Sequence, residues 1–389
     1  MTSDKLLRNR DLIVFGEDFA RHPHSLEHLL RPLFKQNRFI WIETIGLRSP
    51  KFNLYDLKRV VGKIAGWLGP KQVQPQREIP ANITVVSPFM IPFNQFALIR
   101  AFNRWSVARS VRKCIQELGF QNIITVTSVP NSSDYVGDFN ETLKVYICVD
   151  EFSLWPGLDY EMVRKMEEKL LSKCDVVFAT SQALTESKSN GASKTVLLTH
   201  GVEFDHFNIG GKQKTEKLKI CYYGLFDERS DQQLLIDLAK ALPEASLEII
   251  GNVVCDITRL KDEKNIHFLG LVSYAELPKA IKDMDVFILP YVRNELTDNL
   301  NPLKLKEYLS TGRPVIATAL PEVVKLQDYL FVGKDGAEFA AIVNGLEAAS
   351  LQPKGSQALQ YLQASETWEA KAELFTKVLS DHELQQQQR

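Results

Sequence analysis

The chain has 389 residues, of which 44% are hydrophobic and 24% charged, and its formal net charge is −1. This composition excludes a disordered or fibrous protein, and the length predicts two globular domains. No apolar run approaches the ~18 residues of a membrane span and no signal-peptide core follows the charged start, so we expect a cytoplasmic protein.

Short apolar runs rich in β-branched residues alternate with helical patterns through the first half of the chain. They are apolar throughout rather than alternating, which is typical of parallel strands covered by helices on both faces. We expect such strands at 11–16, 39–44, 83–88, 123–128, 145–150, 176–181 and 195–200.

The first strand ends in the turn GEDFARHPHS. Gly16 stands where the backbone turns sharply or approaches a ligand, and Ser25 is the expected N-cap of the next helix. His22 and His24 are candidate contacts for an acceptor or a diphosphate. They could also bind a metal, but no third ligand is evident and the five cysteines stand singly, so no metal cofactor is expected.

Residues 51–113 carry eleven basic side chains and two acidic ones, a balance of +9. Two stretches, 53–69 and 97–115, read as basic amphipathic helices that contain Trp67 and Trp105. This pattern fits peripheral binding to an anionic membrane surface, although ordinary core packing with a solvated basic face explains each helix equally well by itself. Nucleic acid is not an expected partner, because no recognition module is present.

The strand at 145–150 ends with Asp150, and Glu151 follows directly. A carboxylate at a strand end can act as a general base, and like-charge repulsion from its neighbour would suit that role. The alternative is that Asp150 only caps the following turn.

A second series of strands is expected at 218–224, 246–251, 266–271, 286–291, 314–318 and 329–333. Two successive series indicate an α/β protein with two doubly wound domains, each functional at the carboxyl ends of its strands. We place the domains at 1–209 and 210–364, with His200 and Gly201 at the hinge. Residues 365–389 form a final helix and a glutamine-rich tail expected to be disordered.

The segment NPLKLKEYLSTGRPVIAT reads as a short helix with Asn301 as N-cap and Pro302 as its first residue. The helix dipole and Lys304 would attract a diphosphate, and Glu307, at i+3 on the same face, could accept hydrogen bonds from ribose hydroxyls. The plainer alternative is that Lys304 and Lys306 are solvated and Glu307 pairs with one of them.

This segment resembles the donor-binding segment of bacterial GT-B glycosyltransferases, especially the teichuronic acid and exopolysaccharide group. VYICVDEFSLWPGLD, LLTHGVEFDHF, YYGLFDERSDQQLL and DMDVFILPY are similar to that family in the same order. The resemblance implies two Rossmann-like domains facing across a cleft, with a nucleotide sugar, such as a UDP-sugar, held mainly by the C-terminal domain. It also implies an acceptor held by the N-terminal domain, a final helix near Trp368 that packs back on that domain, and no catalytic metal.

Two departures from the broader retaining family bear on the mechanism. Asn299 stands where the first glutamate of an E-x7-E pair is found, and near Gly224 the usual Arg and Lys-Gly pair is replaced by Arg229 alone. The K-x-x-[EQ]-Y pattern at Lys304 is similar to that of the xanthan-assembly glucuronosyltransferase, an inverting enzyme with an aspartate base, for which Asp150 is the candidate here.

We therefore expect a glycosyltransferase at the inner face of the plasma membrane that moves a hexosyl or glycuronosyl group from a nucleotide sugar to a saccharide or polyprenyl-linked acceptor. Sugar selectivity is expected in the loop at 292–301. Two alternatives remain: a nucleotide-sugar epimerase or hydrolase, and a non-catalytic partner subunit of a polysaccharide assembly complex.

Overall fold

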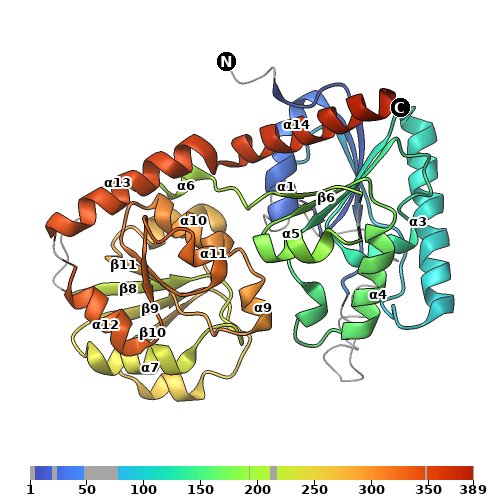
Figure 1. The fold of residues 1–389 in the computed structure, drawn as a ribbon. Helices are drawn as coiled ribbons and strands as arrows, with labels where there is room; N and C mark the ends of the chain where they lie inside the picture. Colours follow the sequence, from blue (N-terminus) through green and yellow to red (C-terminus); the bar gives the residue numbers. More distant parts are fainter. Residues whose placement is uncertain are drawn as a thin grey trace. The chain divides into compact units, whose positions relative to one another are not determined.

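The structure is a computed structural model that describes residues 5–19, 24–47, 78–191, 193–210, 217–346 and 348–388, and no side chains for 348–353. The chain divides into two compact units, Met1–Thr199 with Lys371–Arg389, and His200–Ala370. Each unit is a parallel sheet covered by helices on its two faces (Figure 1). The units change at 199/200 and 370/371, where the sequence interpretation placed boundaries at 209 and 364.

The first unit contains a seven-stranded parallel sheet in the order β3-β2-β1-β4-β5-β6-β7. The order reverses between β1 and β4, which pair in register through residues such as Phe15 and Thr127. All seven predicted strands are present, with ends that differ by a few residues. They are β1 (Asp11–Gly16), β2 (Arg38–Glu43), β3 (Ile83–Val86), β4 (Ile124–Thr127), β5 (Leu143–Cys148), β6 (Val176–Ala179) and β7 (Thr195–Leu197).

Helices cover this sheet because apolar side chains project from both of its faces, and β1 is buried along its whole length. The helices are α1 (Ser25–Leu30), α3 (Ala97–Leu118), α4 (Tyr160–Leu171) and α5 (Gln182–Lys188), with the 3-10 turns η2 (Arg31–Gln36), η3 (Pro130–Asp134) and η4 (Phe152–Leu154). The basic stretch at 53–69 lies outside the described residues.

The end of the chain belongs to the first unit. Helix α14 (Trp368–Gln387) places Phe375 against Phe178 of β6, with ring centroids 5.1 Å apart. Leu7 N donates to Thr376 Oγ1 at 3.2 Å, and Arg10 forms an ion pair with Glu383. The glutamine-rich end, expected to be disordered, therefore continues the helix, because the preceding turns are anchored to the start of the chain.

The second unit contains a six-stranded parallel sheet in the order β10-β9-β8-β11-β12-β13, which reverses between β8 and β11. The six predicted strands are confirmed as β8 (Lys219–Tyr223), β9 (Ser246–Ile250), β10 (Ile266–Gly270), β11 (Val286–Leu289), β12 (Val315–Thr318) and β13 (Phe331–Gly333). The helices are α6 (Phe204–Phe207), α7 (Gln232–Ala241), α8 (Leu277–Ala280), α9 (Glu295–Asp298), α10 (Leu303–Ser310), α11 (Pro321–Val324), α12 (Gly336–Asn344) and α13 (Ala348–Ser365), with η5 (Thr258–Asp262) and η6 (Tyr274–Glu276).

A buried ion pair ties α10 to both ends of the second unit. Lys306, 3% exposed, contacts the Glu366 carboxylate and the carbonyl of His200. A Cβ on Gly201 would lie 2.7 Å from Trp368, so only glycine lets these segments pass so closely. His200, which the sequence interpretation placed at the hinge, is buried, and its ring lies 6.3 Å from that of Trp368.

Candidate functional site

The second sheet has a topological switch point between β8 and β11, where parallel α/β sheets bind ligands. Two loops follow these strands and are joined by backbone hydrogen bonds. Asp231 N donates to Pro290 O at 2.7 Å, and Val292 N donates to Arg229 O at 2.8 Å. The loops that follow β8 and β11 are therefore fixed to each other at this edge of the sheet.

Gly224 ends β8 and makes room for the Lys304 side chain. Its φ is +124°, and a Cβ would lie 2.0 Å from Lys304 Cε and 2.4 Å from Lys304 Nζ. Glycine is thus required twice, by its backbone conformation and by the lysine that crosses it. Gly224 and Lys304, named separately from the sequence, are in direct contact.

The ammonium of Lys304 is enclosed by the tyrosines at the ends of the two strands. It donates to Tyr222 Oη at 2.9 Å, to Leu225 O at 3.2 Å and to Tyr291 Oη at 3.4 Å. It also lies 4.8 Å and 5.9 Å from the ring centroids of Tyr222 and Tyr291. Among the described residues its hydrogen-bond partners are therefore neutral, and its positive charge remains available to an anion.

Arg229 approaches the same place from the loop after β8. Its Nε and Nη2 donate to Asp227 Oδ1 and Oδ2 at 3.0 Å and 2.7 Å, a bidentate pair that fixes the guanidinium. The guanidinium lies 5.7 Å from the Tyr291 ring centroid. Two cations from different halves of the unit's sequence, Arg229 and Lys304, thus lie near Tyr291, at the switch point.

Helix α10 starts one residue later than the sequence indicated. Its N-cap is Pro302, with φ −68° and ψ 108°, and Leu303 is its first residue. Asn301 is therefore not the N-cap, because the extended backbone needed at that position falls on the proline. The solvated state considered for Lys306 is also wrong, since that side chain is buried against Glu366.

Glu307 lies one turn below Lys304 on the same face of α10. Burial raises the pKa of its carboxyl group to about 7, while attraction to Lys304 and a contact with Tyr223 act in the opposite direction and Glu203 adds to the rise. Near neutral pH this side chain exchanges between a carboxylate that accepts hydrogen bonds and an acid that can donate one.

The loop at 292–301 contains the short helix α9, which begins with a capping box between Asn294 and Thr297. Asn299 ends it, donating from Nδ2 to Glu295 O at 2.8 Å. Asn299 and Asn301 are both half-buried, between α9 and α10. Their donor-binding roles stay predictions.

The corresponding edge of the first sheet lies beyond β1 and β4. Gly16 is buried, and a Cβ on it would lie 3.2 Å from Leu26 and 3.3 Å from Trp41. Its carbonyl accepts hydrogen bonds from the N and Oγ1 of Thr44, both at 3.2 Å. Gly16 thus serves a close packing contact at this strand end.

The N-cap of α1 is His24, and Ser25 is the first helical residue, so the predicted cap is wrong by one position. The backbone of His24 is extended, and its Nδ1 accepts a hydrogen bond from Glu27 N at 3.4 Å. Its ring lies 5.7 Å from the ring of Trp41. His22 lies outside the described residues.

Asp150 and Glu151 follow β5, and their side chains have different surroundings. Glu151 accepts from Ser153 Oγ at 2.7 Å and contacts the ammonium of Lys188, which also donates to Glu167 at 2.8 Å. Lys188 therefore offsets the repulsion expected between the two neighbouring carboxylates. Asp150 is half-buried at the strand end.

Sequence reasoning missed the residues that complete these clusters, namely Tyr222, Asp227, Tyr291 and Lys188. The two tyrosines could have been noted, because YYG and LPY close two predicted strands that end at the functional edge. In the described part of the chain, no group of three or more His, Cys, Asp or Glu residues is placed to hold a metal. In the same residues, no helix has the length and apolar character needed to cross a bilayer.

Part of the chain is similar in sequence to known glycosyltransferases. Residues 217–348 match the family model described as Glycosyl transferases group 1. A Bacillus subtilis protein provisionally named teichuronic acid biosynthesis glycosyltransferase TuaH is 22% identical over 182 residues, which are 43% of this chain and 46% of that protein. The matched region thus spans about half the length of that relative.

Solved structures are similar over nearly the whole chain. Sucrose-phosphate synthase from Thermosynechococcus elongatus has a TM-score of 0.70 at 14% identity, covering 96% of this chain and 99% of its own. Anabaena HepE in complex with UDP and glucose has a TM-score of 0.64 at 14% identity, covering 95% and 99%. Residues 217–348 are therefore a glycosyl transferases group 1 domain, and the chain has the GT-B fold of two Rossmann-like units.

Proposed function

We propose that the protein is a glycosyltransferase that moves a sugar from a UDP-sugar to a saccharide or polyprenyl-linked acceptor in cell-surface polysaccharide biosynthesis. The group 1 domain supports the reaction class. HepE complexed with UDP and glucose, and an E. coli trehalose-6-phosphate protein bound with UDP-2-fluoro glucose, support UDP as the nucleotide. The name of TuaH supports a surface polysaccharide as the product.

One observation carries this proposal: among the described residues, Lys304 has neutral hydrogen-bond partners at the switch point, and Glu307 lies one turn below it. A diphosphate in contact with Lys304 and Arg229 would receive charge-assisted hydrogen bonds. The ribose hydroxyls would then donate to Glu307.

The chemistry needs an acceptor hydroxyl to attack the anomeric carbon. The new C–O bond forms as the bond between that carbon and the diphosphate oxygen breaks, and the electron pair leaves with the diphosphate. Lys304 and Arg229 stabilise this growing negative charge. In our scheme Asp150 takes the hydroxyl proton, and Glu151, bound to Lys188, keeps the loop after β5 in place.

The acceptor is proposed to bind at the carboxyl edge of the first sheet, near Gly16, His22, His24 and Ser25. At this edge the cation Lys188 is already bound to Glu151 and Glu167, whereas Lys304 beside Tyr291 has neutral partners. The edge of the first sheet would therefore suit the neutral hydroxyl groups of a saccharide. The cytoplasmic location and the absence of a metal requirement remain predictions.

Nucleotide binding gives the direct test. UDP at about 100 times its Kd should stabilise the protein by about 2.7 kcal/mol, a rise of several degrees in Tm, whereas ADP and GDP at equal concentration should give less. Lys304→Met should abolish the UDP shift, and Lys240→Met, an exposed lysine of the same unit with 64% of its side chain accessible, should keep it.

No stabilisation by any nucleotide or nucleotide sugar would contradict the proposal and favour a non-catalytic partner subunit. Asn299, in place of the family's first glutamate, is the observation that keeps that second candidate in view. UDP release from UDP-sugar that is independent of an added saccharide acceptor would instead indicate a hydrolase.

A further inference from the structure

Helix α3 has one outward face whose composition changes along its length. It is 22 residues long, and Asn103, Val107 and Val111 are buried on its inner side. Side chains at 98, 102, 105, 109 and 112 are exposed and follow one another at spacings of four and three residues, so they line up along one face. Helix α3 lies at the surface of the first unit (Figure 1).

The first half of that face is apolar. Leu98 is 87% exposed, Trp105 58% and Phe102 37%, and the preceding loop adds Phe96 at 55% and Phe89 at 42%. These five residues are the α3 patch. Ring contacts at 6.1 Å between Phe89 and Phe102, and at 5.8 Å between Phe102 and Trp105, join its aromatic members. A contiguous exposed apolar patch marks an interaction surface, whereas single exposed residues do not.

The second half of the face is basic. Arg109, Arg112 and Lys113 follow the patch and are exposed, and Glu117 is the one acidic residue of α3. Lys113 lies 3.7 Å from Glu117, in a pair with 73% and 61% of the side chains exposed. An exposed pair of this kind is weak and screened by salt, so the face keeps a positive charge.

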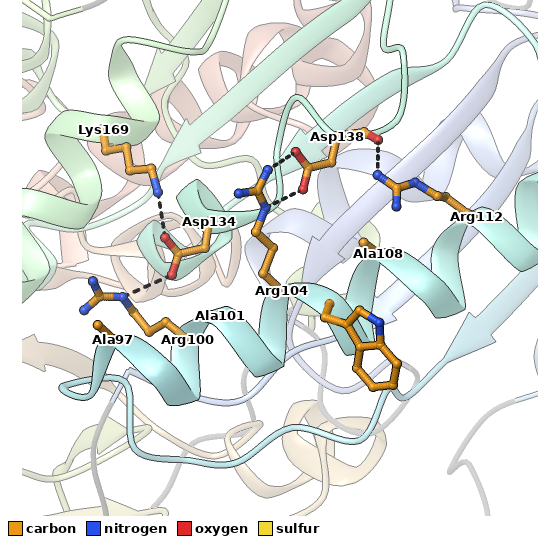
Figure 2. A pocket seen from close by; sticks show the side chains of 10 residues that line it. Ala97, Arg100, Ala101, Arg104, Ala108, Arg112, Asp134, Asp138 and Lys169 are labelled. Atoms are coloured by element: carbon orange, nitrogen blue, oxygen red, sulfur yellow. Dashed lines mark hydrogen bonds and ion pairs between the residues drawn. The ribbon is translucent and has the colours of Figure 1, made fainter.

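A hollow of about 500 Å³ lies beside the patch, between α3, the loop after η3 and α4. In Figure 2, Arg104 reaches from α3 to Asp138 and Arg100 reaches to Asp134. Arg112 donates to the carbonyl of Asp138 at 3.2 Å. With Lys169 included, the hollow has four cations and two carboxylates, which leaves it positive and able to receive a phosphate.

We propose that α3 docks the first unit on an anionic lipid bilayer. The α3 patch inserts its aromatic rings at the level of the headgroups, and Arg109, Arg112 and Lys113 contact the lipid phosphates. Trp105 suits that interface because its indole ring is amphipathic, and the phenylalanines and Leu98 would be buried at the boundary between headgroups and acyl chains. Basic residues beside them are attracted by an anionic surface. A bilayer that contains anionic lipids offers an apolar layer to the patch and phosphates to the basic residues on the same face. This inference is independent of the donor site.

Co-flotation of the full chain with vesicles tests the proposal. The protein should float with vesicles of phosphatidylcholine mixed with phosphatidylglycerol, and much less with phosphatidylcholine alone. Arg109→Gln/Arg112→Gln/Lys113→Gln should weaken binding roughly 100-fold, because three headgroup contacts are lost. Leu98→Ser/Trp105→Ser should weaken it by at least about tenfold through lost apolar burial.

Matched controls separate docking from a folding defect. Leu384→Ser removes a leucine that is 56% exposed on α14 of the same unit, and it should leave flotation unchanged. The α3 variants should keep the far-UV circular dichroism, Tm and UDP shift of the parent protein. If the α3 variants still bind UDP but no longer float with vesicles, the result supports α3 as the docking surface and does not depend on the identity of the acceptor.

Three outcomes would overturn the proposal: no flotation with either vesicle, equal flotation with both, or unchanged flotation of both α3 variants. A parent protein that is dimeric in solution and becomes monomeric in Leu98→Ser/Trp105→Ser would assign the patch to a second copy of the chain instead. If UDP does not raise the Tm of the parent protein but the protein still floats with anionic vesicles, the proposed function is contradicted and the membrane-docking proposal stands.

Discussion

The carboxyl edges of the two sheets occupy equivalent topological positions, yet they handle charge in different ways. In the second unit, Lys304 reaches the switch point with neutral hydrogen-bond partners. In the first unit, Lys188 is buried behind its edge between Glu151 and Glu167. The first arrangement leaves a cation available to a ligand, and the second uses a cation to hold the backbone. Under the proposed function, this difference would let one topology, used twice, bind a charged donor in one unit and the hydroxyl groups of an acceptor in the other.

The sharpest test of this division replaces the carboxylate at the edge of the first unit. Asp150→Asn should reduce the rate of sugar transfer by about 10²–10⁴-fold, the usual contribution of a general base. UDP affinity should not change, because the proposed donor-binding residues Lys304 and Arg229 lie in the other unit. Initial rates with saturating UDP-sugar measure the rate of sugar transfer, and a titration with UDP measures the affinity. Asp328→Asn, an exposed aspartate, is the control; full transfer activity in Asp150→Asn would remove this residue from the mechanism.

Removing the internal cation of the first unit should have a large effect on stability. Lys188→Met leaves Glu151 and Glu167 buried without their shared partner and should lower the free energy of unfolding by about 3–5 kcal/mol. Lys306→Met leaves only Glu366 and should cost less. Urea denaturation followed by circular dichroism measures both, with Lys240→Met as the exposed control. A Lys188 variant as stable as that control would contradict the contrast between the two edges.

The two strand-end glycines allow a matched comparison. Gly224→Ala would place a Cβ 2.0 Å from Lys304 Cε at φ +124°, so it should cost about 1–3 kcal/mol of backbone strain and displace the ammonium. UDP affinity should fall with it. Gly16→Ala would meet contacts of 3.2 Å and 3.3 Å and should leave UDP affinity unchanged. Calorimetric titration with UDP measures the affinity of each variant. Equal UDP affinities in Gly224→Ala and Gly16→Ala would contradict the different roles assigned to the two glycines.

The smallest predicted effect concerns pH. Because the folded protein raises the pKa of Glu307 to about 7, it binds this proton more tightly than the unfolded chain does. Stability should therefore fall as pH rises from the ordinary glutamate value toward 7, and Glu307→Gln should remove that part of the fall. Over the same range UDP affinity should rise, since the carboxylate is the better acceptor for ribose hydroxyls. A UDP affinity that is flat with pH would argue against ribose at this side chain.

Much of the fold could be predicted from the sequence because continuous apolar runs mark parallel strands strongly. All six strands of the second sheet and all seven of the first were identified from that signal. The errors lie at caps and at the end of the chain: His24 and Pro302 take positions assigned to Ser25 and Asn301, and the glutamine-rich end continues α14. Local backbone torsions decide a cap, and neighbouring polar residues are nearly equivalent candidates in a one-dimensional pattern.

The sequence predicted which site residues share one helix, but not which residues from different strands and helices meet in the folded protein. Lys304 and Glu307 share one helix, so their spacing alone placed them together. Tyr222 and Tyr291 come from strands that are neighbours only because the sheet order reverses between β8 and β11. Lys188 meets Glu151 through the packing of α5 beyond β6. Partners of this kind depend on sheet order and on helix placement, which apolar periodicity does not specify.

Helix α10 has a consequence beyond the contacts already described. One side of its two turns presents Lys304 and Glu307, and the other side sends Lys306 to Glu366 and to the carbonyl of His200. Those two anchor points lie where the chain enters and leaves the second unit. A force applied at Lys304 and Glu307 would thus be transmitted through one helix of eight residues to both segments that connect the second unit to the rest of the chain.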